Sequence, residues 1–426
     1  MIRSLRTALV ILLGSVAPQL ALADRATGFD APTKLAEGNH YLAQRQGRFL
    51  MVSLKTPHQV LSTSVVNGGQ SKSIKYLVNY QSMEPRGDQL RYMQQITMNR
   101  EEYHRSIAAQ LAIPPEAMAA MGTAANMHQL ARVEKRFADL AVQVFATAGV
   151  KGNAQRAGDP TSWYQDSSGS TVVNRPAEDA NNHRPLKTDN QGTINIMLLV
   201  NKPLAAGAQT KIAILATEAK SAALAELAVS SRVSSFLATG TGTDQLIVAS
   251  PMGPDSVLLP SASGHLKLGE LVGTAVREAV LQALRWQNGL APSSPGNILE
   301  ALGRFGLTEE TLLKGLQQHL SAADFTLAEQ NLNSITYDSR ASAAAFAYAT
   351  LLDRLQFGNL PISIAPEALL DQAAQVAVAL SAKPLRWAGF RQQLSAVKTD
   401  QLKNHNEQLD LFIAGLAQGW QVKWAD

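Results

Sequence analysis

The order of apolar and polar positions divides the chain into a mixed first part and a helical second part. In the first part, apolar runs at 49–54 and 59–66 contain β-branched residues, with Pro57 between them and a glycine-rich turn at 67–69 after the second. These features predict strands joined by tight turns. Three more apolar runs predict buried strands, at residues 140–146, 193–200 and 246–249.

Segments with helical periodicity alternate with these strands. The first covers residues 89–121, where the Pro-Pro-Glu sequence at 114–116 is interpreted as a helix start. Residues 212–227 carry one apolar stripe, and residues 266–286 place their apolar positions on one face. Because strands and helices alternate, we predict an α/β domain over residues 24–290, with a mixed sheet and flanking helices.

Two later segments break this alternation. Residues 160–190 are rich in Ser, Asn, Asp and Pro and have almost no apolar periodicity, so we predict a long mobile loop. After a Pro- and Ser-rich stretch that begins at residue 291, the chain is rich in Ala and Leu and has few strand signals. We therefore predict a separate all-helical C-terminal region over residues 291–426.

The amino terminus has the pattern of a secretory signal. Arg3 and Arg6 precede an apolar run at 8–17, which is followed by the small-residue sequence 21–23. We predict a signal peptide over residues 1–23, with a periplasmic or secreted mature protein; an uncleaved membrane anchor is the alternative. No later run approaches the roughly 20 apolar residues of a spanning helix, so we expect no transmembrane segment after cleavage.

Composition excludes several classes of function. Lys and Arg number 38 against 34 Asp and Glu, and aromatic residues make up 6% of the chain, so we expect no nucleic-acid partner. The chain has no cysteine, which excludes disulfides, a thiolate nucleophile and Cys-ligated metals. The eight histidines show no zinc-binding spacing, and we expect no metal.

Two loops that follow predicted strands are candidates for substrate binding. The Asn67-Gly68-Gly69 turn exposes backbone N–H groups that suit a carbonyl or an oxyanion, although Asn-Gly is also the commonest hairpin turn. The segment 146–159 concentrates glycine and polar residues where a buried strand ends. Its candidates are Asn153, Arg156 and Asp159, of which the last two also suit a simple surface ion pair.

The segment 239–244 alternates threonine with glycine and ends in Asp244. It lacks the third glycine of a dinucleotide fingerprint and precedes a strand, so a phosphate cradle is disfavoured. We interpret it as a loop that lets a ligand approach the backbone, with Asp244 as an acceptor or base. Its binding candidates are Thr239, Gly240, Thr241, Gly242 and Thr243.

Three further polar residues lie on or beside predicted helices. His265 comes just before a helix, where it suits general acid or base catalysis, although a lone histidine is more often structural. Glu218 and Lys220 flank the apolar stripe of residues 212–227 and suit either the site or a solvated helix edge.

Taken in order, these segments resemble the adenosylcobinamide amidohydrolase family over residues 48–290. The matching blocks lie at 60–69, 78–79, 147–159, 193–196, 217–220, 238–244 and 264–269. The resemblance implies hydrolysis of the amide between aminopropanol and a corrin propionate, in corrinoid salvage or remodelling. It implies a corrinoid substrate and no cofactor, and export favours a non-adenosylated form.

The resemblance identifies positions, and the chemistry of amide hydrolysis suggests their duties. Proton transfer has four candidates: Asp244, Asp159, Glu218 and His265. We expect the amide and backbone groups of residues 67–69, together with Asn153, Arg156, Lys220 and the loop 239–243, to bind substrate. Two alternatives are a periplasmic protein that captures a corrinoid without cleaving it and an unrelated exported hydrolase. For a protein that captures a corrinoid, the polar loop and helical tail are candidates for contact with a corrinoid transporter.

Overall fold

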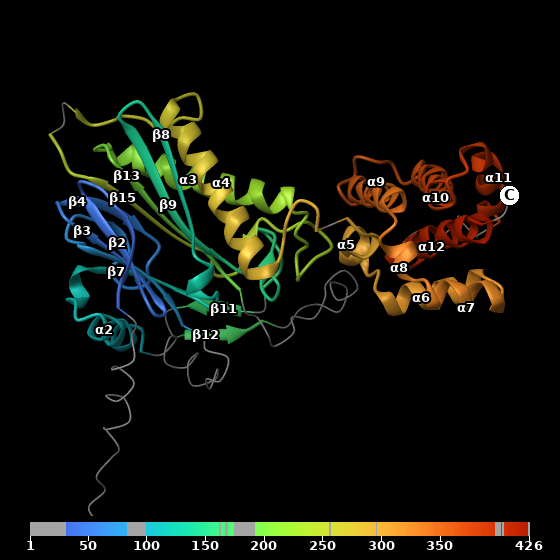
Figure 1. Ribbon diagram of the computed structural model, residues 1–426, viewed down its shortest axis with the longest axis horizontal. Helices are drawn as coiled ribbons and strands as arrows, with labels where there is room; N and C mark the ends of the chain where they lie inside the picture. Colours follow the sequence, from blue (N-terminus) through green and yellow to red (C-terminus); the bar gives the residue numbers. More distant parts are fainter. Residues whose placement is uncertain are drawn as a thin grey trace, which may run out of the picture.

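The computed structural model describes residues 31–82, 99–161, 163–166, 169–173, 192–254, 257–294, 296–396, 402 and 404–424. The predicted signal peptide lies outside these residues, as does much of the predicted polar loop. Two large sheets with flanking helices form the first part of the chain, and residues 298–422 form helices (Figure 1). The fold class predicted from the sequence is therefore confirmed.

The first sheet has the strand order β1-β2-β3-β6-β7. Its strands are β1 (Thr33–Glu37), β2 (Tyr41–Gln46), β3 (Phe49–Leu54), β6 (Tyr76–Gln81) and β7 (Met118–Thr123). Neighbours are antiparallel except β6 and β7, which run parallel. Helix α2 (Arg100–Gln110) packs on this sheet through Ile107, which joins Phe49, Val78 and Met118 in one apolar cluster.

The second sheet has the order β5-β4-β15-β13-β9-β8. Its strands are β4 (His58–Ser62), β5 (Gly69–Ser71), β8 (Ala131–Phe137), β9 (Leu140–Ala148), β13 (Ile194–Val200) and β15 (Gln245–Pro251). Only β13 and β15 are parallel. All seven residues of β13 are buried because both faces of this central strand are covered.

The two sheets face each other and the helices lie outside them. Leu50, Leu77 and Met121 of the first sheet meet Phe145 and Met197 of the second in one core cluster. Helices α3 (Ala206–Glu226) and α4 (Lys267–Asn288) cover the other face of the second sheet through a separate cluster (Figure 1). The layers therefore run helix, sheet, sheet, helix, where the sequence predicted a single mixed sheet.

Several predicted boundaries are wrong. Residues 118–121, predicted as helix, belong to strand β7, which follows a single 3₁₀ turn at Pro115–Ala117, because its alternating apolar side chains fill the space beside β6. Strand β4 ends at Ser62, earlier than predicted. Part of the predicted loop forms a hairpin of β11 (Trp163–Asp166) and β12 (Gly169–Val172).

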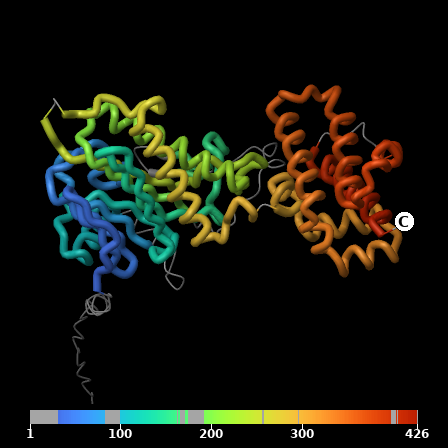
Figure 2. The backbone as a smooth tube through the Cα atoms, turned by 45° about the horizontal axis from the view of Figure 1, so that its top comes forward, coloured from blue at the N-terminus to red at the C-terminus, as the bar shows by residue number. Residues whose placement is uncertain are grey.

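The helical part packs around α10, which contacts α9 and α12 (Figure 2). Its helices are α5 (Ile298–Leu302), α6 (Glu309–His319), α7 (Ala322–Gln330), α8 (Asn333–Thr336), α9 (Ser339–Gln356), α10 (Ala365–Ser381), α11 (Trp387–Leu394) and α12 (His405–Val422). Buried Arg304 donates to the Ser235 carbonyl and to both oxygens of Asp353, which ties this part to the first. Across the described residues, no helix combines the length and hydropathy needed to cross a membrane.

Candidate active site

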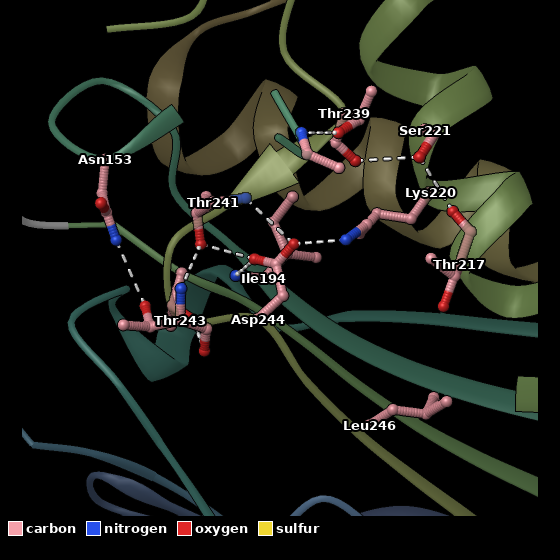
Figure 3. Close-up of polar contacts among 12 residues, drawn as sticks. Asn153, Ile194, Thr217, Lys220, Ser221, Thr239, Thr241, Thr243, Asp244 and Leu246 are labelled. Atoms are coloured by element: carbon pink, nitrogen blue, oxygen red, sulfur yellow. Dashed lines mark hydrogen bonds and ion pairs between the residues drawn. The ribbon is translucent and has the colours of Figure 1, made fainter. Parts of the chain in front are cut away.

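Asp244 organises the loop that carries most of the predicted binding residues. Its Oδ1 accepts hydrogen bonds from the Thr241 hydroxyl at 2.5 Å and the Ile194 amide at 2.9 Å (Figure 3). Its Oδ2 accepts from the Thr241 amide at 3.0 Å and from Lys220 Nζ at 2.5 Å. Four donors use the acceptor positions of one carboxylate, so the Asp244 side chain holds the loop to β13 and α3.

The ion pair between Lys220 and Asp244 explains the glycine at position 240. The Lys220 and Asp244 side chains are only 12% and 15% exposed. A Cβ at Gly240 would lie 2.4 Å from Asp244 Oδ2 and 2.6 Å from Lys220 Nζ, closer than non-bonded atoms can approach. A side chain at position 240 would therefore displace the ion pair.

Further hydrogen bonds join this loop to its surroundings. The Thr239 carbonyl accepts from Ser221 Oγ on α3, and the Thr239 hydroxyl accepts from the Ala157 amide. The short strands β10 (Ala154–Gln155) and β14 (Gly240–Thr241) pair. Asn153 Nδ2 donates to the Gly192 carbonyl and to Thr243 Oγ1, so three segments distant in sequence meet at one end of the second sheet.

A cavity of about 600 Å³ opens beside this loop, between the ends of the two sheets and α2. From the loops just described, it is lined by Asn153, Gly192, Gly242 and Thr243. The first sheet contributes residues of β6 and β7, and the loop after β4 contributes residues 64–66. Its volume lies within the roughly 300–1,000 Å³ typical of small-molecule sites.

Helix α2 forms a wall of the cavity that sequence reasoning missed. Arg100, Tyr103, His104 and Ile107 line it, and Tyr80 of β6 lies close by, its ring 5.9 Å from that of Tyr103. The spacing of Arg100 and His104 on one helical face was the available signal.

A buried polar network lies next to the cavity, between the sheets. Asn79 Nδ2 donates to Thr147 Oγ1, and Asn195 Nδ2 donates to Asn79 Oδ1 and to the carbonyl of Gly122, which lines the cavity. All three side chains are at most 1% exposed. These hydrogen bonds pair the other polar side-chain atoms of the three residues and leave Asn195 Oδ1 buried without a partner, and they link β6, β9 and β13.

Asn67 lies behind the cavity wall. Its Nδ2 donates to the carbonyls of Pro115 and Met118, at 2.8 and 3.0 Å, and lies 3.4 Å from His104 Nε2. Gly68 follows, and a Cβ at this position would lie only 2.0 Å from the Ser64 carbonyl oxygen. Gly69 is exposed and has a φ of 80°. These residues shape the loop 64–66, which lines the cavity.

Asp159 and Arg156 lie on the side of the loop that faces the helical part. Asp159 Oδ2 accepts from the Arg156 amide and from Ser231 Oγ. The Arg156 guanidinium stacks over the rings of Phe236 and Phe357, which are themselves parallel and 5.2 Å apart. Neither residue lines the cavity, and the surface pair between them that the sequence left open is absent from the ion pairs of the described residues.

Glu218 and His265 lie apart from the cavity. Glu218 is exposed on α3. His265 is exposed just before α4, whose other end reaches the site region, where Asn288 accepts from the Val150 amide. The 22 residues of α4 span about 33 Å at 1.5 Å per residue, so His265 lies at the opposite end of the sheet. Within the described ranges, no three His, Asp or Glu side chains group as metal ligands.

The collinear segments around this cavity match a known family model. The model, described as adenosylcobinamide amidohydrolase, matches residues 32–292. The chain belongs to the adenosylcobinamide amidohydrolase family. The match contains every residue that lines the cavity and ends before α5, so the resemblance predicted from sequence is confirmed and the helical part lies outside the family model.

Two individual proteins are similar to this family member. An uncharacterized protein of Methanocaldococcus jannaschii is 32% identical over 238 residues, which cover 55% of this chain and 85% of that protein. A crystal structure of the PH0078 protein from Pyrococcus horikoshii aligns with 60% of this chain and 83% of that chain, at 12% identity and a TM-score of 0.28.

Proposed function

We propose that this amidohydrolase-family protein cleaves the amide that joins aminopropanol to a propionate of the corrin ring in cobinamide or a cobamide. Water supplies the hydroxyl that adds to the amide carbon, the C–N bond breaks, and the amine leaves with a proton. The products are a cobyric acid and free aminopropanol. The family membership of residues 32–292 carries this proposal.

The cavity supports a substrate of this kind. Its wall is largely apolar, with residues such as Val65, Val66 and Ile107, while Asn153, Thr243 and His104 supply polar groups. A corrin ring with its side chains is larger than about 600 Å³, so the reacting arm enters and the ring edge rests at the mouth. Selection of one amide among several then depends on how the ring is held.

The setting in which the reaction occurs is also part of the proposal. The amino-terminal pattern of residues 1–23 supports export to the periplasm or beyond. A substrate met there carries no adenosyl group, so we expect salvage or remodelling of non-adenosylated corrinoids. The residues 298–422, outside the family model, are available for contact with a corrinoid transporter.

The test follows the corrinoid by mass. Purified protein beginning at residue 24 is incubated with cyanocobinamide and adenosylcobinamide, and products are separated by liquid chromatography and mass spectrometry. Release of aminopropanol with a matching cobyric acid is the expected result, faster for the cyano form. Tight binding with unchanged corrinoid mass would refute hydrolysis and favour capture, the rival function.

A pair of variants locates the activity in the cavity. Ala124→Trp introduces a large ring at a cavity-lining position, whereas Ala343→Trp introduces the same ring on an exposed face of α9. We expect the first variant to lose binding and turnover and the second to retain both. Equal activity in the two would place the site elsewhere.

A further inference from the structure

We infer that His104 is the proton-transfer residue of the cavity, an inference that rests on the proposed hydrolysis. His104 lies on α2, its side chain lines the cavity, and it is 7% exposed. The sequence-based candidates for proton transfer are differently placed: Asp244 is saturated with donors, and the other three do not line the cavity. His104 is the one titratable imidazole among the described lining residues.

The hydrogen bond of the ring defines which nitrogen is basic. His104 Nε2 lies 2.9 Å from the Pro115 carbonyl oxygen, which can only accept, so Nε2 carries the hydrogen of the neutral ring. Nδ1 then carries the lone pair and makes no hydrogen bond to any described residue. The same logic operates in serine hydrolases, where a carboxylate bound to one ring nitrogen leaves the other free as the base.

The acceptor for Nε2 is itself held in place. Asn67 Nδ2 donates to the same Pro115 carbonyl at 2.8 Å and to the Met118 carbonyl at 3.0 Å. Asn67 therefore joins the loop after β4 to the 3₁₀ turn that orients the imidazole. This gives Asn67 the duty of a positioning residue, where the sequence suggested a direct substrate contact.

In the chemical step, the His104 imidazole takes up one proton and later gives it back. Nδ1 of His104 takes a proton from water as the water oxygen bonds to the amide carbon, and a tetrahedral intermediate forms. The imidazolium returns that proton to the amide nitrogen as the C–N bond breaks, so that aminopropanol leaves as an amine and the ring becomes neutral again. No cofactor or redox partner takes part.

Among the residues that the structure describes, few other charged or titratable side chains line the cavity with the ring. Arg100 lies one turn earlier on α2 and lines the same cavity, as do the phenols of Tyr103 and Tyr80. Glu116, in the turn that contains Pro115, is exposed to solvent.

The decisive variant is His104→Gln, with His128→Gln as the matched control. Glutamine retains a side-chain N–H for the Pro115 carbonyl but has no basic nitrogen, and His128 is exposed and absent from the cavity wall. We expect kcat for cyanocobinamide to fall about 10²–10⁴-fold in His104→Gln with KM within a few-fold of wild type. The control should retain wild-type kinetics.

Two further readouts separate catalysis from structure. The pH profile of kcat/KM should differ between wild type and His104→Gln, because the variant has no side chain at this position that can take up and return a proton. Added imidazole should raise the rate of His104→Ala. A His104→Gln protein that hydrolyses at the wild-type rate overturns the inference while the proposed function stands; a wild type that binds but never hydrolyses overturns both.

Discussion

Removal of the Lys220 side-chain charge is the most informative perturbation of the organising loop. Lys220→Met keeps an unbranched apolar side chain and removes the ammonium. The Asp244 side chain, which is only 15% exposed, then has no cation beside it. Loss of one member of a buried ion pair costs about 3–5 kcal/mol. Three neutral donors, from Thr241 and Ile194, remain on the carboxylate, so we expect a somewhat smaller loss, about 2–4 kcal/mol.

Thermal unfolding followed by circular dichroism measures this loss. For a domain of this size, each kcal/mol lowers Tm by about 2–4 °C, so Lys220→Met should melt roughly 5–15 °C below wild type. Because the loop 239–244 contributes Gly242 and Thr243 to the cavity, KM for the corrinoid should rise as well. Lys211→Met is the matched control, on the same helix but without an ion pair to any described residue.

A double variant tests the cause of the loss. In Lys220→Met with Asp244→Asn no charge remains buried, so the two substitutions should couple and the double variant should be more stable than the sum of the single losses predicts. If Lys220→Met melts within about 1 °C of Lys211→Met, the ion pair between Lys220 and Asp244 contributes no more than a surface ion pair, and the reasoning is refuted.

Three further outcomes are expected. Gly68→Ala places a Cβ 2.0 Å from the Ser64 carbonyl and should cost about 1–3 kcal/mol and raise KM, whereas Gly207→Ala, which meets no atom within 4 Å, should do neither. Burial lowers the pKa of His405 below its ordinary 6.5, and a hydrogen bond to Gln408 partly opposes this shift. The unfolded chain therefore takes up the proton first as pH falls below about 6.5, and the folded state loses stability there. The Tm of wild type should fall more than that of His405→Gln between pH 7 and pH 5, and equal falls would contradict this. Lysine at position 304 cannot reproduce the paired hydrogen bonds to Asp353 together with the one to the Ser235 carbonyl. Limited proteolysis should therefore cut Arg304→Lys faster than wild type between the first part of the chain and the helical part. An unchanged rate would show that other contacts hold the two parts together.

The sequence by itself determined the elements whose periodicity is set by burial. Strand β13 was predicted because a strand covered on both faces must be apolar throughout, and α3 and α4 because each buries one stripe against a sheet. The family was also determined by sequence, since its short polar and glycine-rich segments are constrained by close approaches such as that at Gly240.

Only the tertiary structure decided which of these segments form one site. Strand β7 was predicted as helix because its apolar run is short, and its pairing with β6 is a contact between distant residues that periodicity does not encode. That pairing completes the first sheet and, with α2, forms the cavity wall that contains His104.

The same limit applies to individual side chains. Asp244 and His265 were equal candidates in the sequence because each polar residue lies at the end of an element. In the folded protein, four donors surround Asp244. His265 lies at the far end of α4, because a helix lengthens by about 1.5 Å with every residue. Residue type indicates what chemistry a side chain can perform, and the packing of the two sheets determined which side chains meet in the cavity.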